Sequence, residues 1–258
     1  MIARAYGVRS VRHGPGSAHA AWANKAPGWE KMANRGLEVA LDERRGVAWR
    51  MGSAGTAARS VPLASRREVD TCGQCHARRA TLADGPARAG RLLDTHDPSL
   101  LARGLFFADG QQQDEVYTYA SFLQSRMHAQ GVTCSDCHDP HSGRLRAPGN
   151  GVCLQCHAEA KYAAQGHTLH RADSAGAGCP ACHMPARTYM VVDPRHDHSI
   201  RVPRPDLSLK HGTPNACNGC HKDKGAAWAA RIVEQAFGPQ RRGGAVAEAL
   251  IAARGTGP

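Results

Sequence analysis

The chain is poor in the side chains that build an ordinary protein interior. Only 5% of its 258 residues are aromatic, while 28 are glycine and 15 are proline, and the mean hydropathy is −0.47. Globular domains of this length usually carry more leucine, isoleucine, valine and phenylalanine. This excludes a core of side chains alone as the main source of stability. No run of 18 apolar residues occurs, which excludes a transmembrane helix.

No cysteine lies outside one repeated pattern. All ten cysteines belong to five copies of Cys-x-x-Cys-His, the attachment signature of c-type haem. In that signature two thiols add to the haem vinyl groups, and the histidine supplies an imidazole to the iron. The predicted attachment residues are Cys72, Cys75, Cys134, Cys137, Cys153, Cys156, Cys179, Cys182, Cys217 and Cys220. The predicted proximal iron ligands are His76, His138, His157, His183 and His221.

Two other cysteine chemistries fit parts of this pattern. Cys134–Cys137 and Cys153–Cys156 have a zinc-ribbon spacing, and ten cysteines could form five disulfides in a secreted protein. Neither alternative explains the histidine after every second cysteine. Five haem c groups also supply the apolar mass that the side chains lack. We therefore expect a multihaem cytochrome fold, mainly α, with long irregular segments wrapped around the haems.

Acidic residues are too few to balance the basic ones. The chain has 33 Lys and Arg against 22 Asp and Glu, a formal net charge of +11, and a pI near 9.5. Such a balance suggests nucleic acid or an acidic membrane as partner. However, the propionates of five haems would add about ten negative charges. Arginine matches carboxylates in a bidentate way, so we expect propionate partners rather than nucleic-acid binding.

An export signal is also missing from the first residues. Met1–Val11 has no apolar stretch and carries Arg4 and Arg9. Haem attachment to this motif takes place outside the cytoplasm, so we expect a periplasmic or extracytoplasmic bacterial protein. Either the true start lies upstream, or the product is never matured.

Three regions follow from the placement of the motifs. Residues 1–67 contain no cysteine, and the alternating apolar residues of Leu37–Met51 predict a small β-hairpin around a charged turn. Residues 68–221 hold all five motifs and form the expected pentahaem cytochrome c domain, with a helix predicted over Asp114–Gln130. Residues 222–258 form a helical tail.

The tail predicts two short helices, Ala226–Phe237 and Ala245–Ala253, on either side of a glycine-rich linker. Neither helix can bury an apolar face alone. The tail therefore looks like the start of a truncated helical repeat.

Ten histidines outside the motifs are enough to give every iron a second imidazole. Methionine is the competing sixth ligand of haem iron. Met184, however, directly follows the proximal ligand His183 and cannot reach the opposite face of that haem. His141 lies three residues after His138, a span of only about 10 Å, so we expect it to bind the iron of a neighbouring haem. His96, His198 and one of the pair His167 and His170 are further candidates, and His128 is an alternate. His196 and His211 are expected to face solvent.

Several segments resemble the multihaem cytochromes related to cytochrome c554 and the octahaem hydroxylamine-oxidoreductase-like group, closest to bacterial members with a tetratricopeptide tail. The resemblance implies extracytoplasmic electron transfer, a mostly α haem-packed fold and paired, stacked haems. It also supports His96, His141, His198 and one of His167 and His170 as distal ligands. The segments that carry it are Gly131–Ser142, Ala147–Asn150, Cys182–Pro194, Asp197–Ser199, Arg201–Ser208 and Gly212–Cys217.

The chain departs from that family near its N-terminus. The family shows Cys-x-x-Cys-His-Gly-Pro-Gly followed by a later histidine, whereas here Arg9 and Arg12 take the two cysteine positions before His13. We interpret this as a lost haem site that only a free haem could occupy, with His13 idle. His19 still qualifies as a distal ligand to a retained haem. The predicted distal set is His19, His96, His141, His170 and His198, with His167 and His128 as alternates.

The leading functional prediction is a chain of five mostly bis-histidine haems that carries electrons between periplasmic or membrane-bound redox proteins. No enzyme activity is required by this interpretation. One alternative is a reductase or oxidase of small nitrogen or sulfur oxo-compounds, which needs one five-coordinate iron. A second alternative is a decayed fragment of such a protein.

Overall fold

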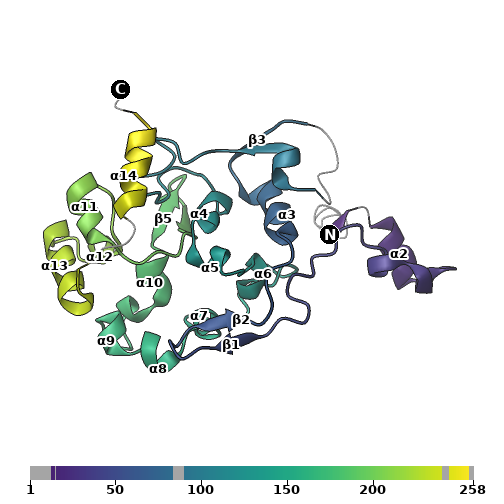
Figure 1. Ribbon diagram of the computed structural model, residues 1–258, viewed down its shortest axis with the longest axis horizontal. Helices are drawn as coiled ribbons and strands as arrows, with labels where there is room; N and C mark the ends of the chain where they lie inside the picture. Colours follow the sequence, from purple (N-terminus) through teal and green to yellow (C-terminus); the bar gives the residue numbers. More distant parts are fainter. Residues whose placement is uncertain (1–12, 15, 84–89, 240–243, 256–258) are drawn as a thin grey trace.

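A computed structural model describes residues 13–14, 16–83, 90–239 and 244–255 (Figure 1). The sequence predicts a mainly α fold with one hairpin, whereas the described residues form a mixed structure. Thirteen α-helices, most of four to seven residues, lie among three antiparallel two-stranded sheets. Short elements are expected where proline and glycine interrupt the chain and isolated helices gain little from cooperativity.

The first region contains the helix α2 (Ser17–Ala23), which projects from one end of the molecule (Figure 1). Two short 3₁₀ segments follow it, η1 (Trp29–Lys31) and η2 (Ala33–Gly36). η2 packs back against α2.

The predicted hairpin is present but displaced along the sequence. Strand β1 (Trp49–Met51) pairs with β2 (Ala57–Arg59), with Trp49 opposite Arg59. The turn lies after β1, where Gly55 adopts a φ of +78° that a residue with a Cβ rarely takes. The prediction was wrong for residues 37–41, because the backbone N–H groups of Glu38 and Val39 donate to the carbonyl of His13 and no strand partner is left for them.

The predicted helix over 114–130 is divided in two. Helix α4 (Tyr119–Leu123) is separated from α5 (Arg126–Ala129) by Ser125, which is extended. The Ser125 hydroxyl accepts a hydrogen bond from the His128 N–H at 3.0 Å. Serine is a favourable N-cap, so this side chain starts a new helix where periodicity alone predicts a continuous one.

The remaining elements connect the motifs to one another. The sheets are β3 (Arg79–Thr81) with β4 (His96–Pro98) and β5 (Ala186–Tyr189) with β6 (Asp193–His196). The helical segments are α3 (Arg67–His76), η3 (Leu92–Asp94), α6 (Cys134–Cys137), α7 (Gly151–Leu154), α8 (Glu159–Tyr162), α9 (Gln165–Thr168), η4 (Ala175–Ala177), α10 (Cys179–His183), α11 (Pro205–His211) and α12 (Ala216–Cys220).

Both helices predicted in the tail are confirmed. α13 (Ala226–Phe237) packs against α11 and buries Ala229 and Val233. α14 (Gly244–Ala253) follows, and Glu248 on it forms an ion pair with Lys210 of α11. That the tail is the start of a helical repeat stays a prediction.

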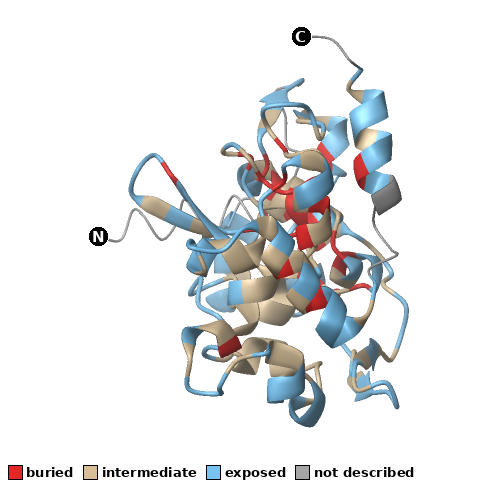
Figure 2. Ribbon diagram, turned by 90° about the vertical axis from the view of Figure 1, so that its left-hand side faces the viewer, coloured by how far each residue is buried: buried red, intermediate tan, exposed pale blue. Residues whose placement is uncertain are grey.

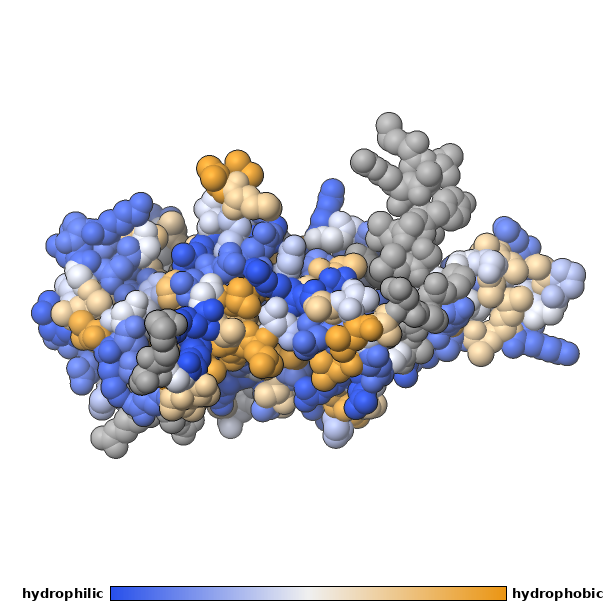
Figure 3. Space-filling model, turned by 90° about the horizontal axis from the view of Figure 1, so that it is seen from above, coloured by the Kyte–Doolittle hydropathy of each residue, from blue (hydrophilic) through white to orange (hydrophobic). Residues whose placement is uncertain are grey.

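The protein interior is thin. Among the described residues thirteen apolar side chains are buried, and four of them are alanines. The bulkiest are Phe106, Phe122, Tyr189, Leu92 and Leu207. Figure 2 shows buried residues mainly near the centre, with half-buried and exposed residues over most of the rest. Figure 3 shows hydrophobic groups scattered over a largely hydrophilic face. In the described ranges, no helix combines the length and the apolar character needed to cross a bilayer.

Gly73, inside the first motif, provides a test of packing at this thin core. An added Cβ would lie 2.7 Å from the Tyr119 ring and 2.8 Å from Leu92. Overpacking of this kind costs about 1–3 kcal/mol, and the helix propensity of alanine offsets about 1 kcal/mol. We expect Gly73→Ala to lower the free energy of unfolding of the matured protein by about 1 kcal/mol.

Gly219, inside the fifth motif, is the matched control. Its added Cβ would meet nothing within 4 Å, so Gly219→Ala is expected to keep or slightly raise the free energy of unfolding. Denaturant unfolding followed by circular dichroism measures both variants. Equal effects of the two substitutions would contradict the packing argument.

Candidate haem-binding sites

Each motif is wound into about one turn of helix. The N–H of His138 donates to the Cys134 carbonyl at 3.0 Å, and His157 and His221 make the same bond to Cys153 and Cys217 at 3.1 and 2.9 Å. The first and fourth motifs lie within α3 and α10. Residues i, i+3 and i+4 share one face of a helix, so both thiols and the imidazole of a motif project from the same side. The donor set thus fits a haem held by two thioethers and one axial nitrogen.

The first two motifs lie side by side. The Ser135 N–H and hydroxyl donate to the Glu68 carboxylate of α3 at 2.5 and 2.7 Å. A hydrogen bond with the Cys72 thiol, and burial after it, raise the pKa of Cys134. These contacts join α3 to α6 and bring the thiols of two different motifs together.

The later motifs continue this arrangement. Asn150 beside the third motif accepts a hydrogen bond from the Cys179 N–H at 2.7 Å. Burial, and after it the neighbouring Cys179, raise the pKa of Cys153 to about 12. Burial raises the pKa of Cys182 as well, with Cys217 of the fifth motif as the next cause.

The second and third motifs are also neighbours. Burial raises the pKa of Cys137 to about 11, with Asp136 and then Cys156 adding to the effect. Motifs that follow one another in the sequence are therefore neighbours in space, from the first to the fifth. The five motifs therefore form one continuous series of neighbours.

Three motif histidines face a histidine from outside the motifs. The ring centroids are 6.4 Å apart for His138 and His198, 5.9 Å for His167 and His183, and 6.0 Å for His170 and His221. The ring planes of the three pairs are 27°, 11° and 28° apart.

This separation fits two imidazoles on opposite sides of one iron. With a metal–nitrogen distance of about 2.0 Å on each side, two ligating rings have centroids about 6 Å apart. Each of the three pairs therefore leaves the spacing that an axially coordinated iron requires.

One ring of every pair is anchored through its other nitrogen. Nδ1 lies 2.9 Å from the His196 carbonyl for His198, 2.7 Å from the Arg201 carbonyl for His183, and 2.7 Å from the Thr168 carbonyl for His170. A carbonyl oxygen only accepts, so each Nδ1 carries the proton and donates it. The lone pair is then on Nε2, the nitrogen left for a metal.

Burial favours the neutral form of three of these six rings. It lowers the pKa of His138, where His76 adds to the effect, and it is the main cause of the lowered pKa of His198. Burial followed by the nearby His183 lowers the pKa of His167. Neutral imidazole is the form that binds metals.

The remaining two motif histidines lie in different surroundings. His76 is exposed at the end of α3 and near His138. His157 packs edge-on against Tyr162 with ring centroids 5.0 Å apart. Its Nδ1 is buried and has no hydrogen-bond partner among the described residues.

Three further predicted ligands make specific contacts of their own. His96 lies in β4 opposite Thr81, with Nδ1 2.8 Å from the Thr95 hydroxyl. His19 stacks on Trp22 of its own helix with centroids 5.5 Å apart. The alternate His128 is only 5% exposed and lies 3.3 Å from an Arg66 guanidinium nitrogen, which can only donate to it.

Two results go beyond the sequence-based expectation. Sequence reasoning assigns one ligand to the pair His167 and His170, yet each of the two faces a different motif histidine. It also predicts that His13 binds no iron and that His141 binds the iron of a neighbouring covalent haem. In the structure the ring centroids of His13 and His141 are 6.2 Å apart. No local signal predicts such pairings, because they join segments far apart in the sequence.

The zinc and disulfide alternatives find little support in this geometry. Among the described residues, no three His, Cys, Asp or Glu side chains gather as a metal site. No disulfide joins any two of the ten cysteines.

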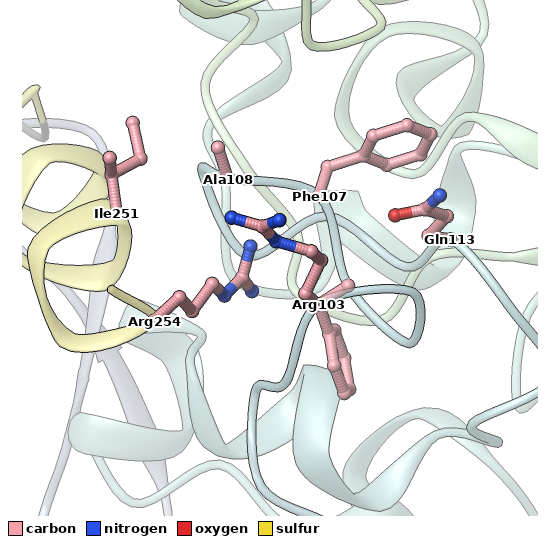
Figure 4. A pocket seen from close by; sticks show the side chains of 7 residues that line it. Arg103, Phe107, Ala108, Gln113, Ile251 and Arg254 are labelled. Atoms are coloured by element: carbon pink, nitrogen blue, oxygen red, sulfur yellow. The ribbon is translucent and has the colours of Figure 1, made fainter. Parts of the chain in front are cut away.

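Two cavities in the described part of the chain are lined by none of the paired histidines. One, of about 210 Å³, lies between α14 and residues 103–113 (Figure 4). The Arg254 guanidinium at its edge donates to the Leu101 carbonyl. The other, of about 590 Å³, is lined by residues 58–59, 61–66 and 128–131.

Glu68, which joins the first two motifs, gives the fold a pH dependence. Burial is the main cause that raises its pKa. A carboxyl group with a raised folded-state pKa stabilises the fold at acidic pH and loses that contribution as the pH rises through the folded pKa. Glutamine can keep both hydrogen bonds to Ser135, because the hydroxyl can accept as well as donate. We expect the unfolding temperature of Glu68→Gln, relative to wild type, to rise between pH 4 and pH 7.

Glu248 is the opposite case and serves as control. Its hydrogen bond with Lys210 lowers the pKa of this exposed carboxyl group, so Glu248→Gln should lose stability relative to wild type as the pH rises. Thermal unfolding of the matured protein across this pH range measures both. Parallel pH profiles for wild type and Glu68→Gln would contradict the assignment.

Comparison with known proteins agrees with this geometry. Residues 127–162 match the family model of the doubled CXXCH motif. The fold is similar to that of the outer cell wall cytochrome OcwA, with a TM-score of 0.53 and 18% sequence identity over 88% of this chain. The chain spans 56% of the length of that cytochrome. A search of curated proteins found no match. The chain thus has a fold similar to that of this cytochrome and contains a doubled CXXCH motif.

Proposed function

We propose that the chain is an extracytoplasmic electron-transfer protein with five covalently bound c-type haems, most of them bis-histidine. The observation that carries this proposal is the set of three histidine pairs, each joining a motif histidine to a non-motif histidine at 5.9–6.4 Å. When bound, haem c supplies one-electron redox chemistry. The spatial order of the motifs supports a linear series of centres.

The axial ligands are assigned from the pairs. His138 and His198 bind the iron at Cys134–Cys137, His183 and His167 bind the iron at Cys179–Cys182, and His221 and His170 bind the iron at Cys217–Cys220. His76 and His157 are the proximal ligands of the other two haems. His96 and His19 are our candidates for their distal positions.

The partners that we propose are periplasmic or membrane-bound redox proteins. The similar cytochrome belongs to an outer cell wall, which supports a place outside the cytoplasm. In this proposal residues 68–221 form the pentahaem domain, while residues 1–67 carry the degenerate motif and the hairpin. Residues 222–258 begin a helical repeat.

The test is the mass and the iron spin state of exported, matured protein. We expect an intact mass of the polypeptide plus five haems, an EPR spectrum of low-spin iron, and reversible multi-electron reduction by dithionite. A polypeptide mass without haem would contradict the proposal and favour the alternative that the chain is a decayed fragment of such a protein. A high-spin fraction that binds nitrite without any substitution would instead favour the reductase or oxidase of nitrogen or sulfur oxo-compounds.

A further inference from the structure

A fourth histidine pair has the same geometry as the other three and lacks cysteines. His13 and His141 have ring centroids 6.2 Å apart and ring planes 21° apart. Both values lie within the ranges of the three pairs that contain a motif histidine, 5.9–6.4 Å and 11–28°. Neither His13 nor His141 belongs to a Cys-x-x-Cys-His motif.

Residues 38–39 fix the His13 ring in place. The His13 carbonyl accepts hydrogen bonds from the N–H groups of Glu38 and Val39 at 3.2 and 3.3 Å. Its Nδ1 in turn donates to the Val39 carbonyl at 3.1 Å, and Val39 is 1% exposed. The lone pair of His13 is therefore on Nε2, as for the anchored ring in each of the other three pairs.

The other ring is held by a tight turn. The Asp139 carboxylate accepts hydrogen bonds from the N–H groups of His141 and Ser142 at 2.8 and 2.9 Å. Since His138 lies three residues before His141, the two histidine sites are within about 10 Å along the chain. The fourth pair is thus next to the haem site of the second motif.

The ligand that fits this pair is a metal ion whose other coordination positions are already occupied by a group that it brings with it. A bare zinc ion in a protein takes four ligands, and no group of three or more possible ligand side chains forms among the described residues. An iron porphyrin brings four equatorial nitrogens and needs only two axial imidazoles. Thioether bonds cannot form here, because Arg9 and Arg12 occupy the positions where a motif ending at His13 would have cysteines.

We propose that His13 and His141 bind a sixth haem without covalent attachment, as an iron protoporphyrin with both vinyl groups intact. His141 is exposed and His13 half-buried, so this haem can exchange with the surroundings, unlike the five at the motifs. It would extend the series of redox centres beside the second motif. The proposal does not depend on the spin state or partners of the covalent haems.

Haemin titration of the matured protein tests the site. We expect one equivalent to bind, to give a low-spin bis-histidine EPR signal, and to be extracted by acid acetone, which leaves thioether-bound haem in place. His13→Ala and His141→Ala should each weaken binding by more than about 100-fold, since loss of an outer-sphere hydrogen bond alone costs about 10–100-fold. His196→Ala, an exposed histidine hydrogen-bonded to the Met184 carbonyl, should bind like wild type.

Two results would overturn the proposal. One is the absence of extractable haem at saturating haemin; the other is haem binding that neither His13→Ala nor His141→Ala weakens. The intact mass after extraction counts the covalent haems separately, so failure of the sixth site is distinguishable from failure of the pentahaem proposal.

A gain of cysteines gives a second measurement. Arg9→Cys with Arg12→Cys completes a Cys-x-x-Cys-His motif at His13, and we expect the sixth haem to become resistant to acid acetone and to add one haem to the intact mass. A variant that keeps five covalent haems and a still extractable sixth would place that haem away from His13 and contradict the assignment.

Discussion

His167→Ala is expected to convert about one fifth of the bound iron from low-spin to high-spin. In the proposed ligand set, His167 faces His183 at 5.9 Å with ring planes 11° apart, the most parallel of the four pairs. Its removal leaves one of five irons with a single axial imidazole. That iron should then bind cyanide or nitrite, and EPR spectroscopy with optical titration measures both changes.

The neighbouring His170 makes this experiment sharper. If His167 and His170 serve different irons, as their pairing with His183 and His221 implies, the double variant should show about twice the high-spin fraction of either single variant. His196→Ala controls for a general perturbation, because it removes an exposed ring but keeps the main-chain carbonyl that His198 uses. Entirely low-spin iron in His167→Ala would rule out this ligand assignment.

A chain made without haem is expected to have no cooperative fold. The described residues bury thirteen apolar side chains, too few for a protein of this length. The motif helices α6, α7, α10 and α12 have four or five residues each, far below the length at which isolated helices persist. Without haem the protein should lose its whole free energy of unfolding, which is about 5–15 kcal/mol for typical domains.

Expression in the cytoplasm, where c-type attachment does not take place, provides the haem-free chain. Circular dichroism and amide hydrogen exchange should show no thermal transition and no slowly exchanging core. The matured protein is the control. A haem-free chain that unfolds cooperatively at a similar temperature would mean that side-chain packing alone holds the fold.

The sequence predicts well the features that depend on neighbouring residues. The motif turns follow from local spacing, and α13 follows from its apolar periodicity between glycines. The helix predicted over 114–130 failed at Ser125, whose capping bond to His128 outweighs the apolar pattern. The hairpin was displaced because the N–H groups of residues 38 and 39 donate to the His13 carbonyl, a contact between segments 25 or more residues apart.

The histidine pairs could not be assigned from spacing, because each depends on tertiary structure. His138 and His198 are 60 residues apart, and His13 and His141 are 128 apart. Counting histidines indicates how many second ligands exist but not which iron they face. His13 was set aside for a chemical reason, the missing cysteines, which bears on covalent attachment and not on coordination.

The carbonyl oxygens that hold the imidazoles have a consequence for how such a protein can change over generations. The acceptors at Val39, Thr168, His196 and Arg201 are main-chain atoms, and replacement of those side chains leaves the acceptors in position. Substitutions at these four positions can therefore accumulate without changing the hydrogen bonds that set the basicity of the imidazole ligands. Selection acts instead on the path of the backbone, which can keep a fold recognisable long after most residue identities are gone.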